Sequence, residues 1–178
     1  MRRVWLNVIF LGWAAVCFAA DKPPAIVTAH ALLASDAVHP GSTVQAAVVA
    51  EVAPGYHIND HKPTLEYLIP SELKLESSPE VSVTDVIYPQ GKLVKFAFED
   101  KSLSVYEGKL VVKAALKVAR TARPGDYTLK GKFAYQACND HACLPPTSVP
   151  VELSVKVVRA GAPVKRVNED VFQSAKPK

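Results

Sequence analysis

Apolar and polar residues alternate along much of the chain between residues 25 and 158. The clearest case is the segment 109–118, in which every second residue is apolar and lysines occupy positions 109, 113 and 117. A repeat of two places successive side chains on opposite faces of a strand, so this segment is predicted to have one face in a core and one in water. The same reasoning predicts strands at 25–34, 43–52, 65–69, 73–76, 81–88, 92–98, 127–135 and 149–157.

Turn-forming residues separate many of these segments. Pro40-Gly41, Pro54-Gly55 and Pro124-Gly125 each combine a proline of fixed φ with a glycine that tolerates a positive φ. No stretch shows a convincing helical repeat of apolar residues. About seven to nine short strands joined by such turns predict an all-β fold, an antiparallel β-sandwich. Alternation alone does not distinguish an immunoglobulin-like topology from a jelly roll.

The N-terminal residues 1–19 are predicted to be a secretory signal peptide. Two arginines precede an apolar run from Val4 to Val16, and small residues follow at Cys17 and Ala19. The run is shorter than the ~20 residues that a membrane span needs, although an uncleaved anchor and a lipidated Cys17 are alternatives. We therefore expect export, a single domain over residues 20–158, and a basic flexible tail over residues 159–178.

The distribution of charge gives no indication of nucleic-acid binding. The formal net charge is +4, and the lysines of the middle region lie singly along the predicted strands. A solvated sheet face explains them, because a nucleic-acid site would gather basic residues beside aromatic ones. The chain also has no glycine-rich phosphate loop, G-x-S-x-G motif or H-E-x-x-H motif, so a hydrolase is not indicated.

Two of the three cysteines remain once a signal peptide is removed. Cys138 and Cys143 have four residues between them, and disulfides form and persist outside the cytoplasm. The chain-entropy model assigns roughly 2 kcal/mol to so short a loop, against more than 4 kcal/mol for a loop that spans a domain. The pair is therefore a weak staple, and two interpretations stay open: a redox-active pair that exchanges with other thiols, or a passive loop disulfide.

Ionisable residues near the cysteines are candidates for tuning them. Asp140 and His141 lie between the cysteines, and His57 and His61 lie in another predicted loop. An imidazolium would favour a thiolate and a carboxylate would oppose it, but these are also common polar loop residues. Cys138, His141 and Cys143 together with His57 or His61 could form a metal site. Their spacing departs from that of zinc knuckles, and we expect no metal.

The segment Tyr135-Gln-Ala-Cys138 through Cys143-Leu-Pro-Pro146 resembles the amino-terminal periplasmic domain of the DsbD thiol:disulfide interchange proteins. The similarity continues upstream through Pro54-Gly-Tyr56, Tyr88-Pro-Gln-Gly91 and Tyr106-Glu-Gly108, and it extends over roughly residues 25–158. Each motif alone is unspecific, whereas their combined order is fairly specific.

The resemblance implies an immunoglobulin-like fold and a periplasmic domain that shuttles reducing equivalents between proteins without a diffusible cofactor. The family's two cysteines match Cys138 and Cys143, with Cys143 as the attacking thiol and Cys138 as the resolving one. A cap loop that covers the cysteines in the family would fall at 96–102. Its aromatic and acidic residues align loosely with those at four positions, Phe96, Phe98, Glu99 and Asp100.

Two departures from the family pattern affect these expectations. The best-known members have five residues between the cysteines, whereas this chain has four. The membrane domain and the thioredoxin-like domain of those proteins are not found in this sequence. We therefore expect a separate membrane electron donor of the DsbD or CcdA type, and periplasmic thioredoxin-like or disulfide isomerase proteins as further partners. The rival interpretation is a binding or assembly module with a structural disulfide.

Overall fold

The computed structural model describes residues 25–97 and 99–173, so the predicted signal peptide and Phe98 lie outside the described residues. The elements in chain order are β1 (Val27–Leu33), β2 (Thr43–Val52), β3 (His57–Asn59), β4 (Glu72–Leu75), β5 (Val81–Ile87), β6 (Lys92–Val94), β7 (Leu103–Tyr106), β8 (Lys109–Val118), β9 (Gly125–Tyr135), β10 (Ala137–Cys138), β11 (Thr147–Val157) and α1 (Glu169–Gln173). No helix among these residues is long and apolar enough to cross a membrane.

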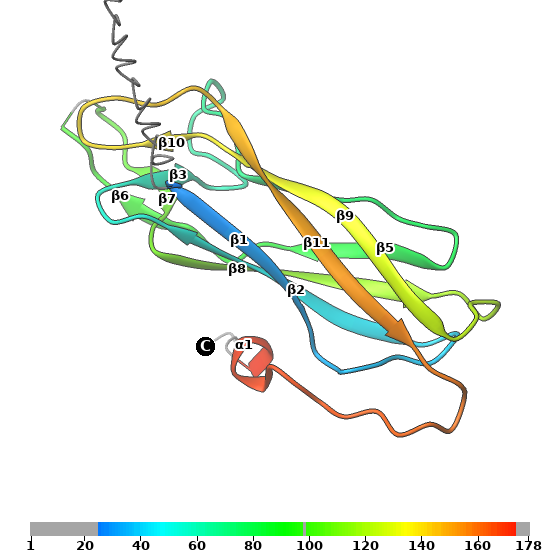
Figure 1. Ribbon diagram of the computed structural model, residues 1–178. Coiled ribbons are helices and arrows are strands. Elements are labelled where there is room, and N and C mark those ends of the chain that lie inside the picture. Colours follow the sequence, from blue (N-terminus) through cyan, green and yellow to red (C-terminus); the bar gives the residue numbers. More distant parts are fainter. Residues whose placement is uncertain (1–24, 98, 174–178) are drawn as a thin grey trace, which may run out of the picture.

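Two antiparallel sheets form a sandwich. Their strand orders are β1-β2-β8-β5 and β11-β9-β4, and Figure 1 shows β9 and β11 crossing over the layer that contains β1, β2 and β8. With seven strands lettered A to G along the chain, these orders are A-B-E-D and G-F-C, the arrangement of the immunoglobulin constant domain. The predicted all-β, immunoglobulin-like sandwich is therefore confirmed, and the strand order settles what alternation could not.

A tyrosine at the turn between β8 and β9 adds a second feature of this fold. The Tyr127 hydroxyl donates a hydrogen bond of 2.9 Å to the carbonyl oxygen of Arg123. A tyrosine near the start of strand F that bonds back to the preceding turn is the tyrosine corner of immunoglobulin-like domains. It ties the turn to the strand that follows.

The core lies between the two sheets and follows the predicted alternation. Leu110, Val112, Ala114, Leu116 and Val118 of β8 are all buried, whereas the lysines between them are partly or fully exposed. One buried cluster joins β2 and β8 to β9 and β11, with Leu116 and Leu129 among its members. Burial of these apolar side chains at roughly 25 cal/mol per Å² is the main favourable term for the sandwich.

A third, smaller sheet is built on one end of the sandwich, with the order β10-β3-β7-β6. It is formed by three connections of the sandwich, between β2 and β4, between β5 and β8, and between β9 and β11, and Figure 1 shows them gathered at one end. Its buried residues Ile58, Tyr106 and Ala137 belong to the same cluster as the adjoining sandwich core. Strands of two to four residues are too short to show a repeat, and β3, β7 and β10 were not predicted.

Two strand predictions need correction in this region. The predicted strand 65–69 is a turn, in which the amide of Leu68 donates to the carbonyl of Leu65 over 3.2 Å. The predicted strand 92–98 ends at Val94. Leu65 and Leu68 pack from the turn on the cluster of Phe96, Leu103 and Val105, and Phe96 lies beyond the end of β6. The burial of these residues therefore does not require a strand.

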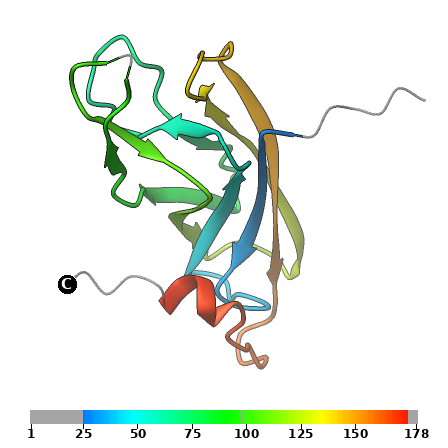
Figure 2. The same cartoon turned by 90° about the vertical axis from the view of Figure 1, so that its left-hand side faces the viewer.

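The C-terminal segment also differs from its prediction as a flexible tail. The Asp36 amide donates to the Lys165 carbonyl at 3.0 Å, and the Val167 amide donates to the Ala34 carbonyl at 3.0 Å. Val171 of α1 is 7% exposed and packs with Ala47 and Val49 on the outer face of the first sheet; Figure 2 shows α1 beside β2. Residues 165–173 are thus part of the folded domain, and residues 174–178 lie outside the described ones.

Candidate functional site

Cys138 and Cys143 face each other across a tight hairpin at the edge of the small sheet. They form a disulfide, with their Cα atoms 4.0 Å apart. Backbone hydrogen bonds flank the pair on both sides, from Asn139 to Ala142 at 3.0 Å and from Leu144 to Ala137 at 2.8 Å. The cysteines therefore occupy a non-hydrogen-bonded position of the hairpin, where opposite side chains approach most closely.

The Asn139 side chain organises the turn between the two cysteines. Its carbonyl oxygen Oδ1 accepts hydrogen bonds from the amides of His141 and Ala142, both at 2.9 Å. Asparagine commonly stabilises a turn by bonding to backbone amides two or three residues ahead. The exposed side chains of Asp140 and His141 extend from this turn, so four residues suffice to bring the sulfurs together.

The two cysteine residues differ in exposure. Cys138 is only 2% exposed. Its strand, β10, lies between β3 and the returning arm of the cysteine hairpin, which contains Cys143. Cys143 is exposed and lines a surface hollow of about 280 Å³ together with Asn139, His141 and Ala142. An incoming sulfur can therefore reach Cys143 without rearranging the core, whereas Cys138 is shielded.

His57 of β3 lies directly opposite Cys138 of β10 in the strand register. It is 4% exposed, and its ring stacks on Phe96 with centroids 4.3 Å apart. Burial lowers the pKa of His57 below 6.5, while the carboxylates of Glu107 and Asp140 act in the opposite direction. The imidazole is therefore neutral at pH 7. His57, Phe96, Glu107 and Asp140 line a groove of about 340 Å³.

Phe96, Glu99 and Asp100 are the described residues among the four that align with the family's cap loop. Of these three, Phe96 contacts the site, through the ring of His57. Phe96 is buried with Leu103 and Val105. Glu99 instead accepts a hydrogen bond of 2.8 Å from the Tyr67 hydroxyl, which lowers the pKa of Glu99. The carbonyl of Asp100 accepts a hydrogen bond from the Lys95 ammonium. The structure thus places Phe96 on His57 and turns the Glu99 carboxylate toward Tyr67.

A carboxylate that the sequence analysis did not identify holds the small sheet to the neighbouring loops. Asp60, just after β3, accepts hydrogen bonds from the hydroxyls of Ser104 and Tyr106, both at 2.6 Å, and from the Gly91 amide at 3.2 Å. Burial raises the pKa of Asp60, but these hydrogen bonds and one from the Lys62 amide outweigh it, so the pKa is lowered overall. Asp60 is ionised at neutral pH.

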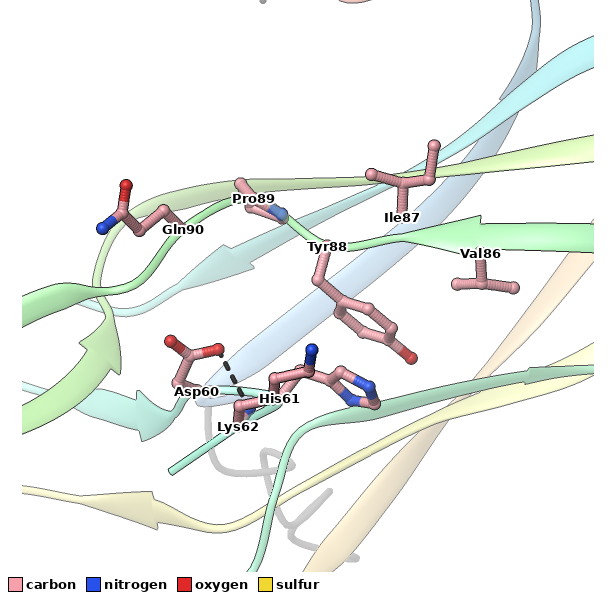
Figure 3. A pocket seen from close by; sticks show the side chains of 8 residues that line it. All are labelled: Asp60, His61, Lys62, Val86, Ile87, Tyr88, Pro89 and Gln90. Atoms are coloured by element: carbon pink, nitrogen blue, oxygen red, sulfur yellow. Dashed lines mark hydrogen bonds between the residues drawn. The ribbon is translucent and has the colours of Figure 1, made fainter. Parts of the chain in front are cut away.

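His61 does not join the cysteines. Its ring stacks on that of Tyr88, with centroids 3.7 Å apart and planes 4° apart. Figure 3 shows the two side chains next to each other. One ring nitrogen is 3.0 Å from the carbonyl of Ser71. Within residues 25–97 and 99–173, no three histidine, cysteine, aspartate or glutamate side chains are grouped so that they could hold a metal ion.

Comparison with known proteins gives one family and several solved structures. The model of the family "Thiol:disulfide interchange protein DsbD, N-terminal" matches residues 26–154. The structure of the N-terminal periplasmic domain of ScsB from Proteus mirabilis is 19% identical, with a TM-score of 0.46; the match covers 71% of this chain and 44% of that one. The chain thus spans less than half of that ScsB structure. No curated protein sequence matches the chain.

Two structures from Neisseria meningitidis are also similar. The reduced DsbD N-terminal domain is 18% identical with a TM-score of 0.37, and the match covers 75% of this chain and 88% of that one. The complex between the DsbD N-terminal and PilB N-terminal domains is 18% identical with a TM-score of 0.39, covering 70% of this chain and 80% of that one.

Proposed function

Because the chain belongs to the family of the N-terminal domain of thiol:disulfide interchange protein DsbD, we propose that it passes reducing equivalents between protein partners through Cys138 and Cys143. The family match confirms the resemblance noted from the sequence, and thiol–disulfide interchange is the function of this family. The observation that carries the assignment to these residues is their unequal burial, with Cys143 exposed beside a hollow and Cys138 shielded.

Unequal burial assigns a different role to each sulfur. In the reduced domain, the Cys143 thiolate attacks one sulfur of a partner's disulfide, and the partner's other sulfur leaves as a thiolate. A mixed disulfide then joins Cys143 to the partner. Cys138 attacks Cys143 Sγ, the mixed disulfide breaks, and the partner leaves with both sulfurs reduced. Two electrons pass to the partner, and the domain regains the Cys138–Cys143 bond.

The partners we propose are thioredoxin-like or disulfide isomerase proteins of the periplasm, with a separate membrane protein of the DsbD or CcdA type as the electron donor. A complex is known between the DsbD N-terminal and PilB N-terminal domains of Neisseria meningitidis, which is consistent with a protein partner. In the direction of domain reduction, a donor thiolate attacks the exposed Cys143 Sγ and Cys138 leaves as a thiolate. Periplasmic location follows from the proposed export signal.

Trapping of the mixed disulfide tests these roles. We expect Cys138→Ser to accumulate a covalent adduct with an oxidised thioredoxin-like protein through Cys143, because the resolving sulfur is missing. Cys143→Ser should form little adduct, because the remaining sulfur is buried. Adducts are counted on non-reducing gels and by intact mass. Equal trapping by both variants would contradict the assignment, and absence of transfer by the native chain would favour a structural disulfide.

A further inference from the structure

Attack by Cys138 requires that its buried thiol lose a proton. Cys138 is 2% exposed, and burial in apolar surroundings disfavours a thiolate. Proton transfer by a positioned side chain contributes about 10²–10⁴-fold to rates in enzymes. A group that takes this proton must lie beside Cys138 within the small sheet, since water has little access there.

The strand register places one titratable side chain at this position. His57 is the direct partner of Cys138 on the neighbouring strand, and Cys143 is its partner on the opposite side. Residues directly opposite in an antiparallel pair have their Cβ atoms about 5 Å apart and point to the same face of the sheet. The imidazole, the resolving sulfur and the attacking sulfur therefore form one row across three strands.

The surroundings of His57 suit proton exchange. Phe96 covers one face of the ring at 4.3 Å, and the ring is neutral at pH 7, so it can accept a proton. Two carboxylates act on it, Glu107 from the turn between β7 and β8 and Asp140 from the cysteine hairpin. Both stabilise an imidazolium once it forms.

On this basis, and resting on the proposed function, we propose that the His57 imidazole accepts the Cys138 proton as Cys138 attacks Cys143, and returns it in the reverse reaction. The Cys138 sulfur supplies the electron pair of the new bond to Cys143 Sγ, the bond between Cys143 and the partner breaks, and the partner sulfur leaves as a thiolate. The proton stays on His57 until solvent removes it. When a donor opens the disulfide, the imidazole takes a proton from solvent and passes it to the departing Cys138 thiolate.

The test uses Ellman's reagent in a stopped-flow instrument with the reduced protein carrying Cys17→Ser, so that Cys138 and Cys143 are the only thiols in the chain. Cys143 releases one thionitrobenzoate as it forms the mixed disulfide, and attack by Cys138 releases a second. His57→Phe retains an aromatic ring for stacking on Phe96 but cannot take a proton. We expect the second release to slow by about 100-fold or more while the first is unchanged.

The pH profile separates proton exchange from a structural role. In the native protein, the rate of the second release should increase with pH as His57 becomes neutral and then reach a plateau. In His57→Phe, the pH profile of this rate should lack the bend. Glu107→Gln removes a carboxylate that raises the pKa of His57, so the bend should move to lower pH. Glu107 is exposed and its ion pair with Lys92 is a surface pair, so its loss costs little stability.

Each outcome has a defined meaning. A second phase of native rate and pH profile in His57→Phe would overturn the inference while leaving the interchange function intact. A bend that does not move in Glu107→Gln would also overturn it, and this variant does not depend on tolerance of the core to a new ring. If Cys143→Ser gave the rapid first release, the proposed roles of the sulfurs would fail whatever His57 does.

Discussion

His57 and Cys138 lie directly opposite each other on β3 and β10, and the sulfur of Cys138 is bonded in turn to that of Cys143. The first of these residues comes from the connection between β2 and β4, the second and third sandwich strands, and the other two come from a hairpin near the end of the domain. Pairing of these connections therefore builds the site. The sandwich below supplies the rigid support that such a site needs.

The disulfide should contribute little to stability. Only five positions separate the cysteines, and the chain-entropy model assigns roughly 2 kcal/mol to so short a loop. We expect urea unfolding of the native protein to show a free energy of unfolding lower by about that amount in the presence of a reductant. Cys138→Ala/Cys143→Ala serves as the control, because it should not respond to the reductant. Loss of cooperative unfolding on reduction would identify a structural staple.

Replacement of Asp60 by asparagine should destabilise the domain at neutral pH by about 2 kcal/mol, because hydrogen bonds to a charged group are among the stronger ones. The lowered pKa of Asp60 means that the unfolded chain binds its proton first as the pH falls. The contribution of Asp60 to the free energy of unfolding is fully present above pH 3.8. It is lost as the pH falls through the lower pKa of Asp60 in the folded state.

Urea denaturation at pH 7 and near pH 3 measures this effect. Asp60→Asn should show a smaller loss of stability on acidification than the native protein. The exposed Asp126→Asn is the matched control, and it should behave like the native chain at both pH values. An Asp60→Asn variant as stable as the native protein at pH 7 would contradict the role of the network.

The pKa of His57 should be measurable by NMR as lower than 6.5. The unfolded chain protonates this histidine near pH 6.5, whereas the folded protein does so only at lower pH, so stability falls as the pH drops through this interval. Histidine proton shifts recorded between pH 4 and 8 give the value directly. Phe96→Ala should hydrate the ring and raise the pKa of His57, and an unchanged value would show that the stacking does not shield it.

The contact between α1 and the first sheet should stabilise the domain. Val171 is 7% exposed against Ala47 and Val49, and Val171→Ala should lower the free energy of unfolding by about 1–2 kcal/mol through the lost buried methyl groups. Val164→Ala is the control, since Val164 is 37% exposed in the same segment. Both values come from urea denaturation, and equal effects would indicate that α1 does not stay on the sheet.

Local sequence patterns were sufficient to predict the sandwich and to identify the cysteine pair. The long strands β2, β8, β9 and β11 each contain enough alternating residues to reveal a buried face, and their limits agree with the predicted segments to within about two residues. Cys138 and Cys143 are close in sequence, so a hairpin can join them without help from distant segments. The motifs around them were likewise sufficient to identify the family.

Contacts between distant segments could not be read from such patterns. The small sheet consists of strands too short for a repeat, and its register depends on how three loops pack on the end of the sandwich core. This packing places His57 beside Cys138, gathers Ser104 and Tyr106 around Asp60, and holds α1 against β2. A periodic pattern shows the neighbours of a residue within its own strand. The residues that it contacts in other loops are determined by the shape and burial of the whole domain.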